Sequence, residues 1–70
     1  MQDLTGRSAD TRHLAGLFIY THLPPHLREI SIPCHDLAEA MILASPDGPE
    51  LTAGLRKLLE AKDCFVRAAL

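Results

Sequence analysis

The feature that most constrains the fold is a turn sequence that separates two long stretches of helical periodicity. Ser45-Pro46-Asp47-Gly48-Pro49 places turn-forming residues in five consecutive positions, and such clusters interrupt regular structure. Pro49 suits the first position of a new helix, where its missing N–H would have no partner. A connection this short makes two helices antiparallel neighbours. The sequence therefore predicts an αα-hairpin centred on this turn.

Apolar residues recur every three or four positions on both sides of the turn, as they do on one face of a helix. This periodicity predicts one helix over residues 25–44 and another over residues 49–69. Pro33 falls inside the first range and removes one backbone N–H. We therefore expect a kink there, or two collinear helices that meet near residues 31–33. The apolar positions are Leu27, Ile30, Cys34, Leu37, Ala38, Met41 and Ile42, then Leu51, Leu55, Leu58, Leu59, Phe65, Val66 and Ala69.

The chain before the double proline at 24–25 is less regular. Residues 1–10 are polar and without period, and we expect them to form a flexible arm. Asp10 or Thr11 could cap a short helix, but Phe18-Ile19-Tyr20-Thr21 favours a β conformation. Residues 11–23 are therefore predicted to be either a short helix or an extended segment.

Size and composition place these elements in one small domain. The chain has 70 residues, is rich in Leu and Ala, and is 47% hydrophobic and 23% charged, which is typical of packed helices. A chain of this length buries only ~60% of its unfolded surface and is marginally stable alone, so we expect partner subunits. The predicted fold is all-α: an antiparallel helical hairpin over residues 1–70, with a short N-terminal segment, assembled as a homo-oligomer.

Several classes of function are disfavoured by what the sequence lacks. No signal peptide or membrane span is recognisable, so we expect a reducing, cytoplasmic location. A net charge of −2 gives no general attraction for DNA. The sequence has no nucleophile elbow, phosphate-binding glycine loop or recognisable pair of catalytic carboxylates. We therefore expect a protein that is not an enzyme and uses no cofactor.

The cysteines and histidines leave two minor hypotheses open. Cys34 and Cys64 belong to no paired spacing, but the register of the turn would place them opposite each other. Packing as small apolar residues is the favoured interpretation, with a thiol switch or a metal site as the alternative. His22 and His26 have i,i+4 spacing, yet two prolines lie between them, so that stretch is not a helix interior. We expect no metal site.

The polar side of the last predicted helix supports two interpretations. Arg56–Glu60 and Asp63–Arg67 have the i,i+4 spacing of self-pairing charges on a solvated face. The adjacent cations Arg56 and Lys57, together with Arg28, instead suggest a cluster for an anion. One antiparallel hairpin would keep Arg28 far from Arg56, whereas an oligomer could bring them together.

Five short stretches resemble a known family. They are His22-Leu-Pro-Pro-His26 with Asp36-Leu-Ala38, then Pro46-Asp-Gly-Pro-Glu-Leu-Thr52, and then Leu55-Arg-Lys-Leu-Leu-Glu-Ala-Lys62 with Arg67-Ala68. Together they resemble the helical hairpin domain of phage anti-defence proteins that act as sponges for immune signals. Members of that family block CBASS by binding cyclic oligonucleotides, and relatives block Thoeris by binding a cyclic ADP-ribose derivative. The resemblance covers roughly residues 18–70.

This resemblance implies a homohexamer with ligand pockets between subunits and no chemistry on the ligand. It implies Tyr20 and His22 on the base side of a pocket, and cations on the phosphates. The sequence departs from the family where Thr21 separates the aromatic residue from the histidine, where Leu59 replaces a glutamate, and where His35 and Asp36 replace a lysine. The candidate ligand-binding residues are Tyr20, His22, Pro24, Arg28, Arg56, Lys57 and Arg67.

The expected function is therefore sequestration of cyclic di- or trinucleotides or cyclic ADP-ribose isomers in the host bacterial cytoplasm. The alternative is a small helical protein–protein interaction module of a phage or bacterium, with no nucleotide ligand. Changing Arg56 and Lys57 to Ala would separate the two, since phosphate binding needs those cations and an apolar docking surface does not.

Overall fold

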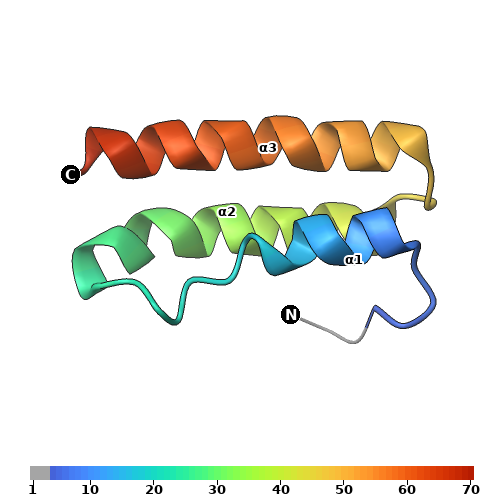
Figure 1. Ribbon diagram of the computed structural model, residues 1–70, viewed down its shortest axis with the longest axis horizontal. Coiled ribbons are helices and arrows are strands. Elements are labelled where there is room, and N and C mark those ends of the chain that lie inside the picture. Colours follow the sequence, from blue (N-terminus) through green and yellow to red (C-terminus); the bar gives the residue numbers. More distant parts are fainter. Residues whose placement is uncertain (1–3) are drawn as a thin grey trace.

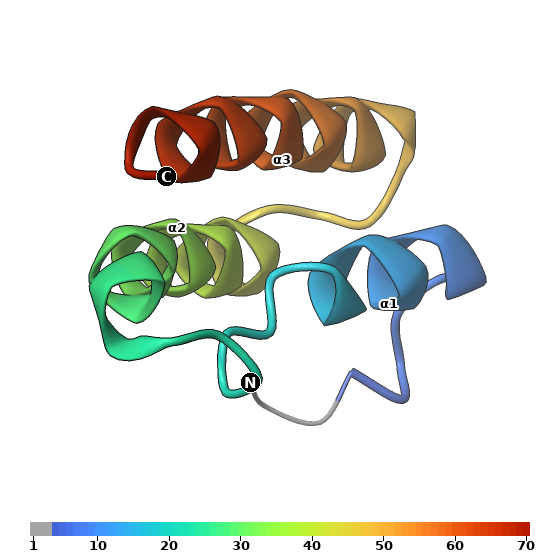
Figure 2. The same ribbon diagram turned by 60° about the vertical axis from the view of Figure 1, so that its left-hand side comes forward.

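The computed structural model describes residues 4–70, and the all-helical class predicted from the sequence is confirmed for them. They form α1 (Ala9–Gly16), α2 (Pro25–Ala44) and α3 (Pro49–Ala68), with no strand. α2 and α3 lie side by side and run in opposite directions, and α3 packs against both α2 and α1 (Figures 1 and 2). The molecule measures 34 × 21 × 18 Å. None of these helices is long and apolar enough to cross a membrane.

Prolines define where the two long helices begin. Pro25 and Pro49 occupy first positions, where a residue without an N–H loses no hydrogen bond. Gly48 precedes α3 with φ 154° and ψ −178°, a conformation that essentially only glycine adopts. α2 continues through Pro33 as one helix, so the alternative of two collinear helices was wrong. The proline removes one hydrogen bond, and the turns on either side keep the helix continuous.

α1 begins earlier than the sequence suggested. Ser8 is its N-cap, and the Ser8 hydroxyl accepts a hydrogen bond from the backbone N–H of Thr11. The expected cap at Asp10 or Thr11 was therefore wrong. The helix ends at Gly16, and residues 17–24 form turns rather than the extended segment offered as the alternative.

Hydrogen bonds attach part of the predicted flexible arm to the rest of the molecule, and residues 1–3 of that arm lie outside the described residues. Two guanidinium nitrogens of Arg7 donate to the backbone oxygens of Ile42, at 2.6 Å, and Ser45, at 2.9 Å. These carbonyls end α2, where no further turn supplies donors. The segment that precedes α1 therefore caps the C-terminus of α2.

Asp47 completes this attachment from the turn between α2 and α3. Its carboxylate accepts hydrogen bonds from the hydroxyl of Thr11, at 2.7 Å, and from the backbone N–H of Ser8, at 2.9 Å. The Thr11 hydroxyl is the main reason that the pKa of Asp47 lies below its ordinary value, followed by the Ser8 amide. The start of α1 and the α2–α3 turn are thus held together by polar contacts.

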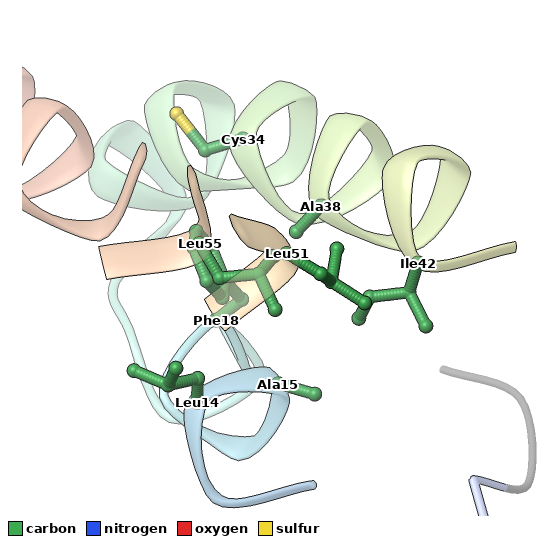
Figure 3. Close-up of a cluster of buried hydrophobic side chains, with 8 residues drawn as sticks. All are labelled: Leu14, Ala15, Phe18, Cys34, Ala38, Ile42, Leu51 and Leu55. Atoms are coloured by element: carbon green, nitrogen blue, oxygen red, sulfur yellow. The ribbon is translucent and has the colours of Figure 1, made fainter. Parts of the chain in front are cut away.

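The core lies where the three helices meet. Phe18 and Ile42 are fully buried and Leu55 is nearly so, and Figure 3 shows Phe18, Leu51 and Leu55 meeting at its centre. Burying such side chains stabilises the fold by about 1.5–3 kcal/mol each. The core side chains are Leu14, Ala15, Phe18, Cys34, Ala38, Ile42, Leu51 and Leu55.

The two cysteines do not share this core. Cys34 is buried, but Cys64 is exposed on the other helix, so the expectation that both thiols face each other was wrong. Counting about 100° per residue around α3, position 64 falls well away from the buried positions 51, 55 and 62. The guanidinium of Arg67 donates to the sulfur of Cys64 at 3.4 Å.

Candidate binding surfaces

The first four candidate residues lie in the segment that leads into α2 and in the first turn of that helix. Tyr20 packs the edge of its ring against the ring of His35, with centroids 5.1 Å apart and planes at 83°. His22 and Pro24 are exposed. The Nε of Arg28 donates to the backbone oxygen of Leu23 at 2.7 Å. One arginine of the predicted phosphate cluster is thus attached to the His-x-Pro motif.

Sequence reasoning gave no role to His35, although this side chain positions Tyr20. His35 is only 7% exposed, and its Nδ1 lies 3.0 Å from Oδ1 of Asp36. Its Nε2 lies 3.9 Å from Oε2 of Glu39. The contact with Asp36 orients the imidazole, and the ring of Tyr20 packs against it. In the sequence, the burial of His35 was indicated only by its position directly after Cys34, a member of the apolar stripe.

Arg56 and Lys57 lie elsewhere, on the exposed side of α3. Arg56 contributes to a hollow of about 400 Å³ beside the start of the helix. Asp10 and Asp47 also line this hollow, so one cation faces two carboxylates there. The α3 N-terminus has no side-chain cap. The remaining lining residues are Ser8, Gly48, Pro49 and Thr52.

One chain does not bring the two groups of cations together. Leu37 and Met41 share a groove with Gly54 and Leu58, so Arg56 lies level with about residue 39 of α2. Arg28 stands eleven positions before that level, which is roughly 16 Å along the helix at 1.5 Å per residue. The candidate residues therefore form two separate surfaces in a single subunit.

The remaining charges of α3 behave differently from the sequence interpretation. Within residues 4–70, neither Arg56–Glu60 nor Asp63–Arg67 forms an ion pair. Lys62 does not belong to the solvated face at all. Only 9% of it is exposed, its Nζ donates to the backbone oxygen of Leu17 at 2.9 Å, and the ammonium lies 5.8 Å from the centroid of the Phe18 ring.

An apolar groove of about 490 Å³ runs between α2 and α3, on the side away from α1. Part of the predicted apolar stripe of α2 opens into it rather than into the core: Leu37 is 48% exposed and Met41 is 44% exposed. The predicted apolar stripe of α2 is thus only partly covered in a single chain. The lining residues are Leu37, Met41, Ser45, Pro46, Glu50, Leu51, Gly54, Leu55 and Leu58.

A second hollow, also of about 490 Å³, lies further along the same two helices. Phe65, which the sequence placed on the apolar side of α3, lines it and is 57% exposed. The other lining residues are Glu29, Ile30, Pro33, Cys34, Ala68 and Ala69.

No three His, Cys, Asp or Glu side chains among residues 4–70 are placed to hold a metal ion. Searches against protein-family models, curated proteins and solved structures found no match to this chain.

Proposed function

We propose that this protein is a non-enzymatic binding protein that works as a homo-oligomer of helical hairpins and sequesters a small anionic nucleotide of the cyclic di- or trinucleotide or cyclic ADP-ribose type. The observation that carries the proposal is the arrangement of its cations. Arg28 lies beside the His22-Leu23-Pro24 motif, whereas Arg56 and Lys57 lie roughly 16 Å away along the helices. A pocket that uses both groups needs residues from more than one subunit.

The chemistry of each group suits its part of such a ligand. Tyr20 offers a ring that can stack on a base, which contributes about 1–3 kcal/mol in single-strand binders. Arg28 and Arg56 can each bind a phosphate through two parallel hydrogen bonds, and Lys57 adds a compact positive charge. The sequence resemblance to anti-CBASS and anti-Thoeris sponges supports the same assignment. Arg67, the last cation of α3, lies at the same end of the helix pair as Arg28.

The proposed function is tested by native mass spectrometry of the full chain with a panel of cyclic di- and trinucleotides and cyclic ADP-ribose isomers. A sponge must compete with a tight receptor, so we expect about nanomolar affinity, equivalent to ~−12 kcal/mol. Replacing Arg56 and Lys57 by Ala should abolish ligand binding. Arg12→Ala is the matched control, because Arg12 is an exposed arginine of α1 outside both surfaces. Failure of every ligand to bind would contradict the proposal.

A second candidate function is favoured by the uncovered groove between α2 and α3. An apolar groove between two helices is a common docking site for a helix of another protein. In this case Leu37 and Met41 would carry binding, and the Arg56 and Lys57 variants would bind the protein partner as well as the wild type does. Calorimetry with a defined partner and both sets of variants would separate the two functions.

A further inference from the structure

The two hollows between α2 and α3 belong to one continuous face. Counting about 100° per residue, Ile30, Leu37 and Met41 lie within about 40° of one another around α2. On α3, Leu58 and Phe65 likewise lie within about 40° of each other around the helix. This face borders the core, since Leu58 is half-buried and also packs against the core side chains. Among residues 4–70, the charged residues that line the hollows are Glu29 and Glu50.

The spacing of this face indicates what it binds. On α3, Gly54, Leu58, Ala61, Phe65 and Ala68 follow one another at steps of four, three, four and three. This is the repeat by which one helix packs along another, and it runs beside the buried repeat through Leu51 and Leu55, with Leu58 packing against that core as well. α2 carries a matching series of Ile30, Pro33, Leu37, Met41 and Ala44. The occupant of such a face is therefore helical.

Side-chain size points to a second copy of this chain. Gly54, Ala61 and Ala68 recur every seven residues and leave shallow positions, and Leu58 and Phe65 project between them. A surface that carries both projections and shallow positions at one repeat can match itself across a two-fold axis. The two long helices of one copy would also cover both long helices of the other. A single helix is only about 10 Å wide and would leave part of the face uncovered.

The area available is enough for such a contact. Twenty residues make each helix about 30 Å long, and two neighbouring helices are about 20 Å wide, which agrees with the 34 × 21 Å extent of the molecule. A face of this size gives roughly 600 Å² per copy and roughly 1,200 Å² in total, the lower end of stable interfaces. A 70-residue chain that is marginal alone would gain its missing apolar burial there.

We infer that this face, defined by Ile30, Leu37, Met41, Leu58 and Phe65, binds the same face of a second copy to form a four-helix core. The inference rests on the homo-oligomer of the proposed function and names the surface through which its subunits pair. The long helices of the two copies then form one bundle, with α1 of each copy on the outside.

The inference is tested by analytical ultracentrifugation of the full chain and two variants of α2. Leu37→Glu places a carboxylate in the face, and Leu43→Glu makes the same change on the same helix outside the two groove hollows. The two leucines are similarly exposed, at 48% and 52%. We expect Leu37→Glu to weaken self-association by about a hundredfold or more, because an unpaired charge is costly to bury. Leu43→Glu should leave it unchanged.

Phe65→Glu, on α3, should weaken self-association as Leu37→Glu does, and circular dichroism should show that all three variants keep their helices. A wild-type chain that stays monomeric at every concentration would overturn the inference, and so would equal effects of Leu37→Glu and Leu43→Glu. A monomer whose face binds lipid vesicles instead would also overturn it. A dimer that binds no nucleotide would contradict only the proposed function. An oligomer that binds nucleotide and is unchanged by Leu37→Glu would contradict only this interface, and a monomer that binds nucleotide would contradict both this interface and the shared pocket.

Discussion

Replacing Lys62 by methionine tests whether a buried ammonium holds α1 against α3. The Nζ of Lys62 donates to the backbone oxygen of Leu17 at 2.9 Å and lies 5.8 Å from the ring centroid of Phe18. A hydrogen bond from a charged group contributes about 1.5–3 kcal/mol, and a desolvated cation–π contact about 0.5–2 kcal/mol. Part of this gain is offset by the cost of burying the charge.

We therefore expect Lys62→Met to lower the free energy of unfolding by about 2 kcal/mol. Methionine keeps an unbranched stem of similar length and a similar helix propensity, so the change removes mainly the ammonium. For a chain of this size, about 2 kcal/mol corresponds to a fall in Tm of ~8–16 °C. The backbone oxygen of Leu17, at the end of α1, would lose its donor.

Urea unfolding followed by circular dichroism, at one fixed protein concentration, measures the effect, since self-association would add its own stabilisation. Lys57→Met is the matched control, because Lys57 is an exposed lysine of the same helix. Its effect should stay within about 0.5 kcal/mol. If Lys62→Met unfolds at the same or a higher urea concentration than the wild type, the ammonium does not stabilise the fold and the reasoning is refuted.

Three further changes test other parts of the fold. Gly48→Ala should destabilise the protein by about 1–3 kcal/mol in thermal unfolding, because φ 154° strains any residue with a Cβ; an unchanged Tm would contradict this. Ser31→Ala should stabilise it by about 1 kcal/mol, because the Ser31 hydroxyl is buried without a hydrogen-bond partner among residues 4–70 and Ala favours helices; a loss of stability would show that the hydroxyl has a hydrogen-bond partner. The lowered pKa of Asp47 means that its contribution is complete above the unfolded pKa and is lost as the pH falls through the folded pKa. Asp47→Asn should therefore be less stable than the wild type at neutral pH, and urea unfolding should show the gap closing in acid; a gap independent of pH would argue against this role.

The candidate site was only partly predictable from the sequence. The His22-Leu23-Pro24 motif and Arg28 are close in the chain, and the structure joins them through a hydrogen bond. Arg56 and Lys57 are adjacent in sequence and exposed together. Their distance from Arg28 follows from the antiparallel course of the helices, which the turn at Asp47 to Pro49 had already indicated. The support of Tyr20 by His35 depends on a contact between a turn and a helix, which no local pattern encodes.

The sequence by itself determined α2 and α3, because the proline, glycine and apolar periodicity that define each helix lie within it or directly beside it and act locally on the backbone. Only the tertiary structure decided the rest. Arg7 and Asp47 attach residues 7–11 to the end of α2 and the following turn through partners 35 to 39 residues away. Lys62 is buried because the end of α1 packs against it. Which part of the α2 stripe is covered depends on how α3 and the core residues at the end of α1 pack against it. Periodicity shows that a face is apolar, but only packing decides what covers it.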